Sequence, residues 1–326
     1  MNKEFPKIKS LVRNAKSALI ASHLDPDGDA LGSMLALGQA LEQLGLAVTC
    51  YCADQLPKLY RFLPGSERIK RELVLGQHFD LFFIVDSSDL ARIGDKLEPR
   101  HLAPVIINID HHPDNSRFGD INYVMQTSSA AEEIFDLCQY LKVRIDKRLA
   151  DCLYAALITD TGNFRYENTS AKTFLMAAEL LRAGVDTHEI TTRIYDTKSI
   201  SSVKVCARAL NEIKFSPDKK VAWTVVTETM MHETGAKSED LVGIVDRIRA
   251  IDGVEVAVVF REDNGRVKIN FRAKEKANVS EIARRFGGGG HHKAAGAVVA
   301  GETAAVVEKV ILEVLKYFRA ASFLVE

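Results

Sequence analysis

One stretch of this 326-residue chain, residues 22–33, concentrates side chains that could bind a metal ion. Within it, His23 is followed by the three carboxylates of Asp25, Asp27 and Asp29. Negative charges this close repel one another unless a cation lies among them. Carboxylate oxygens suit hard divalent ions and imidazole suits first-row transition metals, so the mixture favours Mn²⁺ over Zn²⁺. The same residues are also typical of an acidic loop that caps the next helix, and the loop alone does not separate the two interpretations.

The segments around this stretch predict a parallel β-sheet. An apolar run at 18–21 leads into it, and a helical pattern at 31–44 follows it. Two more continuous apolar runs, 80–86 and 104–110, are separated by further helical patterns. Continuous apolar strands that alternate with helices indicate an α/β fold, in which a parallel sheet has helices on both faces. Ligands of such folds bind at the carboxyl ends of the strands.

Further acids and imidazoles follow the later segments. Asp86 and Asp110 each end a predicted strand, His111 and His112 come directly after Asp110, and Asp160 follows a predicted helix. Each residue alone is more often structural, but their repetition at one sheet edge indicates a single site with enough ligands for two metal ions. Two ions about 3.5–4 Å apart can clamp the oxygens of a phosphoryl centre through an in-line displacement. Asp86, from the middle of the predicted sheet, is the natural bridging carboxylate.

The pattern of strands and helices restarts in the last third of the chain. Residues 221–227 predict a strand, and residues 254–272 predict a hairpin around an Asp-Asn-Gly turn. A second, smaller α/β domain with its own sheet is therefore expected. We predict a catalytic domain at 1–195, a helical linker at 196–215 and the smaller domain at 216–326.

A glycine run in this second domain, Gly287 followed by Gly288, Gly289 and Gly290, allows two interpretations. It could be a helix C-cap with a flexible turn. It could instead let the backbone approach an anionic group, with amide N–H groups and His291 as donors. The surrounding sequence is rich in cations, namely Arg266, Lys268, Arg272, Lys274, Lys276, Arg284, Arg285 and Lys293. Such a charge run is commonly only a solvated face, but a basic domain beside an acidic metal centre suits a phosphate-bearing substrate.

Two arginines are the main candidates for phosphate contacts. Arg272 is the best single candidate, because a guanidinium can bind two phosphate oxygens at once. Arg165 lies shortly after Asp160 and could add another contact.

The overall composition excludes some classes of function. The chain has 43 basic and 44 acidic residues and a formal net charge of −1, so no general basic field steers long nucleic acid. Its five cysteines form no CxxC pair, and their odd number argues against a disulfide framework. No segment has the length of a membrane span. These features predict a cytoplasmic protein without a membrane partner.

The order of these motifs resembles that of the DHH phosphoesterase superfamily. Four motifs carry the resemblance: His23-x-x-Pro26-Asp27-x-Asp29, Val85-Asp86, Asp110-His111-His112 and Thr159-Asp160-Thr161-Gly162. The glycine run with His291, followed by Ala294-Ala295-Gly296, resembles the signature of the DHHA1 substrate-binding domain. Chain length and domain order look most like the bacterial nanoRNase/pAp phosphatase group of that superfamily.

The resemblance implies two sets of Mn²⁺ ligands that share Asp86. They are His23, Asp27 and Asp86 for one ion, and Asp29, Asp86, His111 and Asp160 for the other. His112 would face the substrate phosphate as a hydrogen-bond or proton donor. Asp110 would hold an imidazole in its orientation, and Asp25 lies outside the pattern. Mg²⁺ or Co²⁺ are the expected substitutes for Mn²⁺.

The implied activity is the two-metal hydrolysis of short oligoribonucleotides to mononucleotides, together with removal of the 3′-phosphate of pAp. A cleft between the domains would limit substrate length. Hydrolysis of a cyclic dinucleotide or of pApA stays open as an alternative, because the same metal centre would serve it. A non-catalytic nucleotide-binding protein would be expected to lack a ligand, and none is missing at the matched positions. The resemblance also leaves a homodimer open.

Overall fold

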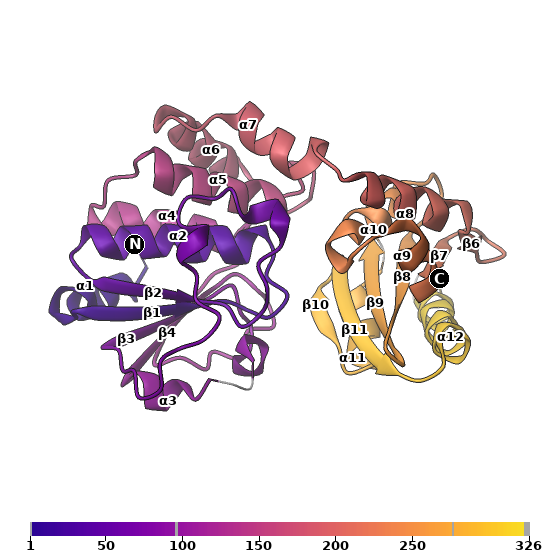
Figure 1. The fold of residues 1–326 in the computed structure, drawn as a ribbon, viewed down its shortest axis with the longest axis horizontal. Coiled ribbons are helices and arrows are strands. Elements are labelled where there is room, and N and C mark those ends of the chain that lie inside the picture. The colour runs from indigo at the N-terminus through magenta and orange to yellow at the C-terminus, as the bar shows by residue number, and fades with distance from the viewer. Residues whose placement is uncertain (1, 95–96, 276, 323–326) are drawn as a thin grey trace. The chain divides into compact units, whose positions relative to one another are not determined.

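The computed structural model describes residues 2–94, 97–275 and 277–322, with side chains as far as residue 317. The chain divides into two compact units, Met1–Thr197 and Lys198–Glu326 (Figure 1). Each unit has its own sheet and its own hydrophobic core, so each is described by itself. The predicted linker at 196–215 largely coincides with the first helix of the second unit, α8 (Ile200–Asn211).

The first unit is built on a five-stranded sheet with the order β2-β1-β3-β4-β5. All four neighbouring pairs in it are parallel, as the continuous apolar runs predicted. The strands are β1 (Ser17–Ala21), β2 (Ala47–Tyr51), β3 (Leu81–Val85), β4 (Val105–Asp110) and β5 (Ile121–Val124). The sequence did not predict β5, a four-residue edge strand that alternates buried and half-buried residues.

Helices cover this sheet unevenly. They are α1 (Phe5–Asn14), α2 (Gly28–Gln43), α3 (Pro99–Leu102), α4 (Ala130–Leu141), α5 (Lys147–Asp160), α6 (Ala171–Arg182) and α7 (Thr187–Thr191). The large core joins one sheet face to α1, α2, α4 and α5, while a smaller cluster lies on the other face, near the short α3 (Figure 1). The α/β prediction is confirmed. The α1 helix was missed, although Phe5, Ile8 and Val12 form its buried stripe.

Two glycines allow the N-terminal end of α2 to lie against α5. A Cβ atom on Gly32 would lie 2.4 Å from the carbonyl oxygen of Cys152, and one on Gly28 would lie 2.4 Å from Thr159 Oγ1. Only glycine fits at these positions without a shift of the neighbouring atoms. The close approach brings the start of α2, where Asp29 lies, near Asp160 at the end of α5.

The second unit is a six-stranded sheet with the order β10-β11-β9-β8-β7-β6, in which β7 and β8 are parallel and all other pairs are antiparallel. Its strands are β6 (Lys214–Phe215), β7 (Val221–Val226), β8 (Val256–Asp263), β9 (Arg266–Ala273), β10 (Gly289–His291) and β11 (Ala294–Ala300). The predicted hairpin is β8–β9. The glycine run is more than a turn, since its last two residues and His291 form β10.

The α-helices that accompany this sheet in the described residues are α8, α9 (Glu228–Thr234), α10 (Ile244–Arg249), α11 (Val279–Arg284) and α12 (Thr303–Ser322). One core joins α11 and α12 to one sheet face, and another joins α8 and α10 to β7 and β8 on the other face. No helix in the described part of the chain has the length and apolar character needed to traverse a lipid bilayer.

Candidate metal centre

The centre of the cluster is Asp86, which directly follows the central strand β3. Its backbone lies in the left-handed region, with φ of +52°, which Asp and Asn tolerate better than most residues. The side chain is 2% exposed, and its Oδ1 atom has no hydrogen-bond partner among the described residues. A buried carboxylate oxygen without a donor is costly, so this atom fits a bound cation.

One group of ligand atoms contains His23, Asp27 and Asp86, which lie within 4.8 Å of one another. His23 Nε2 is 3.4 Å from Asp86 Oδ2. On its other side, His23 Nδ1 is 2.6 Å from the carbonyl oxygen of Leu24, so Nδ1 carries the proton and Nε2 faces the cluster. Asp27 is the N-cap of α2, where its Oδ1 accepts from Ala30 N at 3.0 Å.

A second group contains Asp29, His111 and Asp160. His111 Nε2 lies 3.6 Å from Asp29 Oδ2, 3.4 Å from Asp86 Oδ1 and 3.7 Å from Asp160 Oδ2. One imidazole nitrogen thus faces three carboxylates that come from different parts of the fold. Every residue of the two predicted ligand sets lies in one of these groups, and Asp86 reaches both.

Asp29 is held by the N-terminus of another helix. Its two oxygens accept from the backbone N–H groups of Ala130 and Ala131, at 2.7 and 3.2 Å, in the first turn of α4. Ser33 Oγ donates to the same carboxylate at 2.9 Å. The free amides and the dipole of a helix N-terminus favour a negative charge, so α4 fixes and stabilises Asp29.

His112 and Asp110 form a pair beside the cluster. His112 Nδ1 is 2.7 Å from Asp110 Oδ1, and Asn115 Nδ2 donates to Asp110 Oδ2 at 2.6 Å. Asp110 is fully buried, and both of its oxygens are engaged. It therefore fixes the orientation of the His112 ring. His112 Nδ1 also lies 3.6 Å from Asp86 Oδ1.

Burial and mutual repulsion shift the pKa values of the carboxyl groups in the cluster. Burial raises the pKa of Asp29 well above its usual range and raises that of Asp160 to about 6. Burial also opposes ionisation of Asp86, but contacts with His111 and His23 hold its pKa well below the usual range. Burial lowers the pKa of His23, yet Asp86 outweighs this and raises it to about 9. Without a metal, protons on these carboxyl and imidazole groups therefore offset the repulsion among the carboxylates. A divalent cation could replace those protons.

The remaining predicted residues come from other elements. Arg165 Nε donates to the carbonyl oxygen of Gly162 at 2.6 Å, in the turn after α5. In the second unit, Ala294 pairs with both His291 and Arg272 across the sheet, which places those two side chains on one face. Arg272 Nε lies 3.5 Å from Asp246 Oδ1.

Two of the four glycines in the run of the second unit, Gly288 and Gly290, have no room for a side chain. A Cβ atom on Gly288 would lie 2.0 Å from Gly296 O, and one on Gly290 would lie 2.6 Å from Ala294 O. Around Gly289, by contrast, a Cβ atom would meet nothing within 4 Å.

Sequence reasoning missed the residues that support the cluster from outside. Asn115 holds Asp110, and Asn168 Nδ2 donates to the backbone oxygens of Ser128 and Asp160 at 2.8 and 3.1 Å. No local pattern marks such residues, because their partners are distant in sequence or are backbone atoms.

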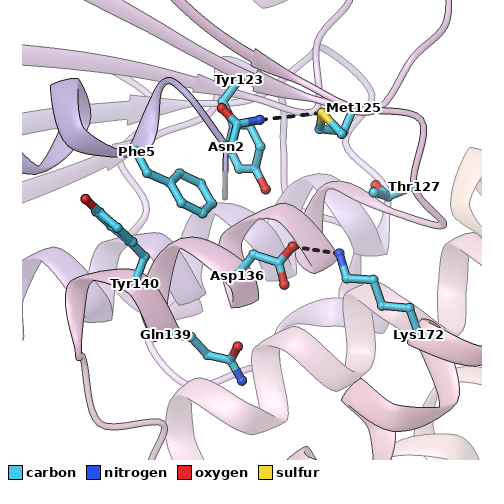
Figure 2. Close-up of a pocket in the computed structure, with 9 residues that line it drawn as sticks. All are labelled: Asn2, Phe5, Tyr123, Met125, Thr127, Asp136, Gln139, Tyr140 and Lys172. Carbon is cyan, nitrogen blue, oxygen red and sulfur yellow. Dashed lines mark hydrogen bonds and ion pairs between the residues drawn. The ribbon is translucent and has the colours of Figure 1, made fainter.

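A surface pocket of about 630 Å³ lies elsewhere in the first unit, and no predicted site residue lines it (Figure 2). Its walls come from the N-terminus, the end of β5, α4 and the start of α6. The residues that line it are Asn2, Phe5, Tyr123, Met125, Thr127, Asp136, Gln139, Tyr140 and Lys172. Lys172 Nζ and Asp136 Oδ2 form an ion pair of 2.6 Å, and Asn2 Nδ2 lies 3.5 Å from Met125 Sδ.

The first unit thus defines an α/β protein with a buried carboxylate–imidazole centre, of the kind that holds divalent cations, at the carboxyl edge of a parallel sheet. Comparison with known proteins gives the family. Residues 17–157 match the N-terminal domain of the DHH family, and residues 218–320 match the DHHA1 domain.

Relatives match over most of the chain. A bifunctional oligoribonuclease and PAP phosphatase from Thermus thermophilus is 33% identical over 82% of this chain and 79% of its own. A protein of the same name from Bacillus subtilis is 26% identical over 82% and 84%. A solved structure from Bacteroides fragilis, described as exopolyphosphatase-related, has a TM-score of 0.90 and 27% identity, and covers 99% of this chain and 100% of its own. The chain therefore belongs to the DHH family of phosphoesterase enzymes and carries a DHHA1 domain, as the motifs predicted.

Proposed function

We propose that this enzyme hydrolyses short oligoribonucleotides to mononucleotides and removes the 3′-phosphate of pAp, using two divalent metal ions. The observation that carries the proposal is the cluster around Asp86, where all six predicted ligands from four separate motifs come together. The names of the relatives from Thermus thermophilus and Bacillus subtilis support the substrates.

In the proposed centre, His23, Asp27 and Asp86 would hold one ion, and Asp29, Asp86, His111 and Asp160 would hold the other. Mixed carboxylate and imidazole ligands favour Mn²⁺, with Mg²⁺ or Co²⁺ as substitutes. When bound, the ions supply Lewis-acid polarisation of the phosphoryl oxygens and activation of the attacking water. The protein supplies a fixed set of charges, because α4 orients Asp29 and the Leu24 carbonyl orients His23.

His112 is the proposed proton donor. Asp110 accepts the Nδ1 proton of His112, which leaves Nε2 to face the substrate. In its protonated form, His112 would donate from Nε2 to a phosphoryl oxygen or to the leaving oxygen. The fixed ring orientation limits the reorganisation that this step requires.

We assign substrate binding to the second unit. Arg272 and His291 share one sheet face beside the glycine run, and a guanidinium and an imidazole both suit a phosphate group. Arg165 is a further proposed phosphate contact, since its Nε is fixed by Gly162 just after Asp160. Each of the five cysteines is a free thiol, which supports a cytoplasmic location.

The test is turnover of a substrate panel with Mn²⁺: pAp, ribonucleotides of two to five residues, pApA and cyclic dinucleotides. We expect release of mononucleotides from the short ribonucleotides and of phosphate from pAp, with catalytic efficiencies well above those for the cyclic compounds. A preference for a cyclic dinucleotide, or turnover of pApA without turnover of pAp or of any other short ribonucleotide, would contradict the proposed substrates. Full activity in excess chelator would contradict the metal-dependent mechanism.

A further inference from the structure

Glu133 is a buried acid that the proposed mechanism does not use. It lies in the first turn of α4 and is 0% exposed. Its Oε1 accepts from the backbone N–H of Met125 at 3.0 Å and lies 3.3 Å from Thr127 Oγ1. Its Oε2 is buried and has no hydrogen-bond partner among the described residues. A carboxylate in such a place costs free energy, so its contacts need an explanation.

The side-chain hydrogen bonds of Glu133 lead to residues 125–127, a short segment beyond the end of β5. On one side this segment touches the metal centre: the carbonyl oxygen of Thr127 is 3.4 Å from His111 Nδ1, and Met125 N is 3.2 Å from Asp110 O. His111 Nε2, the other ring nitrogen, faces the three carboxylates of the cluster.

On the other side the segment has little packing. The side chains of Met125 and Thr127 line the surface pocket, and Met125 is 46% exposed (Figure 2). The sheet ladder reaches only Met125, through its N–H and Asp110 O, because β5 ends at Val124 and is an edge strand. The buried carboxylate of Glu133 contacts both Met125 and Thr127 and so ties the segment to α4.

We propose that Glu133 is a positioning residue for His111. By holding residues 125–127, it keeps the Thr127 carbonyl where it accepts the Nδ1 proton of His111, and so directs Nε2 toward the metal. The partner of the distal nitrogen commonly fixes the ring of a metal-binding histidine. This inference rests on the proposed metal centre, but it does not depend on which substrate is hydrolysed.

The test compares the Mn²⁺ affinity of Glu133→Leu with that of matched variants. Electron paramagnetic resonance of free Mn²⁺ measures this affinity. We expect Glu133→Leu to weaken binding of one of two ions by about 10–100-fold, the usual effect of losing such outer support. Met125 N keeps its contact with Asp110 O, so the fold should survive. Glu133→Gln retains an acceptor for Met125 N and should bind Mn²⁺ within about threefold of the original protein.

Two controls separate positioning from general damage to α4. Glu132 is the neighbouring buried acid, but it accepts from Thr173 Oγ1 at 2.7 Å and from Ser128 Oγ at 2.5 Å, and so contacts the residue after the 125–127 segment and not the segment itself. Glu132→Leu should lower the melting temperature while leaving Mn²⁺ affinity unchanged. In a His111→Ala background, Glu133→Leu should cause no further loss, because Glu133 acts through His111.

The inference is overturned if Glu133→Leu binds Mn²⁺ with normal affinity. It is also overturned if Glu133→Leu lowers Mn²⁺ affinity by the same factor in the His111→Ala background, or if Glu132→Leu lowers it as much as Glu133→Leu does. A tenfold loss in Glu133→Gln would also overturn it, because charge rather than positioning would then explain the effect. These readouts need no substrate. If the unsubstituted protein binds Mn²⁺ but turns over no substrate of the panel, the proposed function is refuted and the inference about Glu133 is not affected.

Discussion

At the scale of single residues, burial and neighbouring charges together set the pKa values of the acids in the cluster. Asp86 stays ionised because two imidazoles face it, while burial raises the pKa values of Asp29 and Asp160, and the neighbouring carboxylates add to that effect. The residue types and their order predicted that acids and imidazoles gather at one sheet edge, because the strand ends of a parallel sheet converge. The resemblance to the DHH family implied which six of them are ligands. Supports such as Asn115 and Asn168 could not be predicted, since no periodicity brings an amide to a partner across the fold.

Asp86→Asn tests the shared ligand. Asn tolerates the left-handed backbone, so we expect an intact fold, but loss of the shared charge should lower turnover of every substrate at least about 10³-fold, equivalent to several kcal/mol. Asp25→Asn is a matched control, because Asp25 also has φ of +52° and lies in the neighbouring loop outside the ligand set. Kinetics and metal content are measured on both. Near-normal activity of a folded Asp86→Asn variant would refute the shared-ligand assignment.

The pH dependence follows from His23, whose pKa rises to about 9 in the metal-free fold. Since an unfolded histidine titrates near about 6.5, this group stabilises the metal-free protein fully below that pH and loses its effect as pH rises through about 9. The metal-free melting temperature should therefore fall from pH 6.5 to 9.5. Mn²⁺ binding releases protons, so its stabilising effect should grow over the same range.

Activity should accordingly decline as pH drops toward about 6, and excess Mn²⁺ should partly restore it. Differential scanning fluorimetry with chelator and with Mn²⁺, beside initial rates, checks both trends. A metal-free protein that is more stable at pH 9.5 than at pH 6.5 would show that His23 does not dominate this range.

At the scale of elements, the site depends on how closely helices approach the sheet edge. The start of α2 lies against α5, and the start of α4 donates two amides to Asp29. The main strands and helices followed from apolar periodicity. The short β5 and α9 did not, because four to seven residues give too little pattern. The β10 strand was hidden in a glycine run, and its backbone pairing with β11 only appears in three dimensions.

Gly32→Ala tests the approach of α2 to α5. Its new Cβ atom would lie 2.4 Å from a backbone oxygen, so one helix must move, at a cost of about 1–3 kcal/mol. We expect a lower melting temperature and weaker Mn²⁺ binding, because Asp29 would move away from Asp160. Gly38→Ala on the same helix would place a Cβ atom against side chains, the nearest being Cys50 Sγ at 3.1 Å, and should cost less. Equal effects of the two variants would argue against a special role for this contact.

At the scale of the whole molecule, the chemistry is divided along the chain. All proposed metal ligands precede residue 161 and lie in the first unit, whereas Arg272 and His291 lie in the second. The family order of motifs predicted this division. The net charge of −1 leaves phosphate recognition to local groups rather than to a general field. The second unit should therefore contribute binding and positioning, without contributing to metal affinity.

The last prediction separates these two contributions. Arg272→Ala and His291→Ala should leave Mn²⁺ stoichiometry unchanged, but should lower kcat/KM on dinucleotides at least about 100-fold, because positioning can supply several kcal/mol of the barrier. A small aryl phosphoester offers no nucleotide to the second unit, so its hydrolysis should fall much less. Lys316→Ala, on α12 against the other sheet face, is the control and should change neither rate. Metal content by mass spectrometry accompanies both assays. Loss of metal in either variant, or equal losses on both substrates, would mean that these residues support the metal centre instead of the substrate.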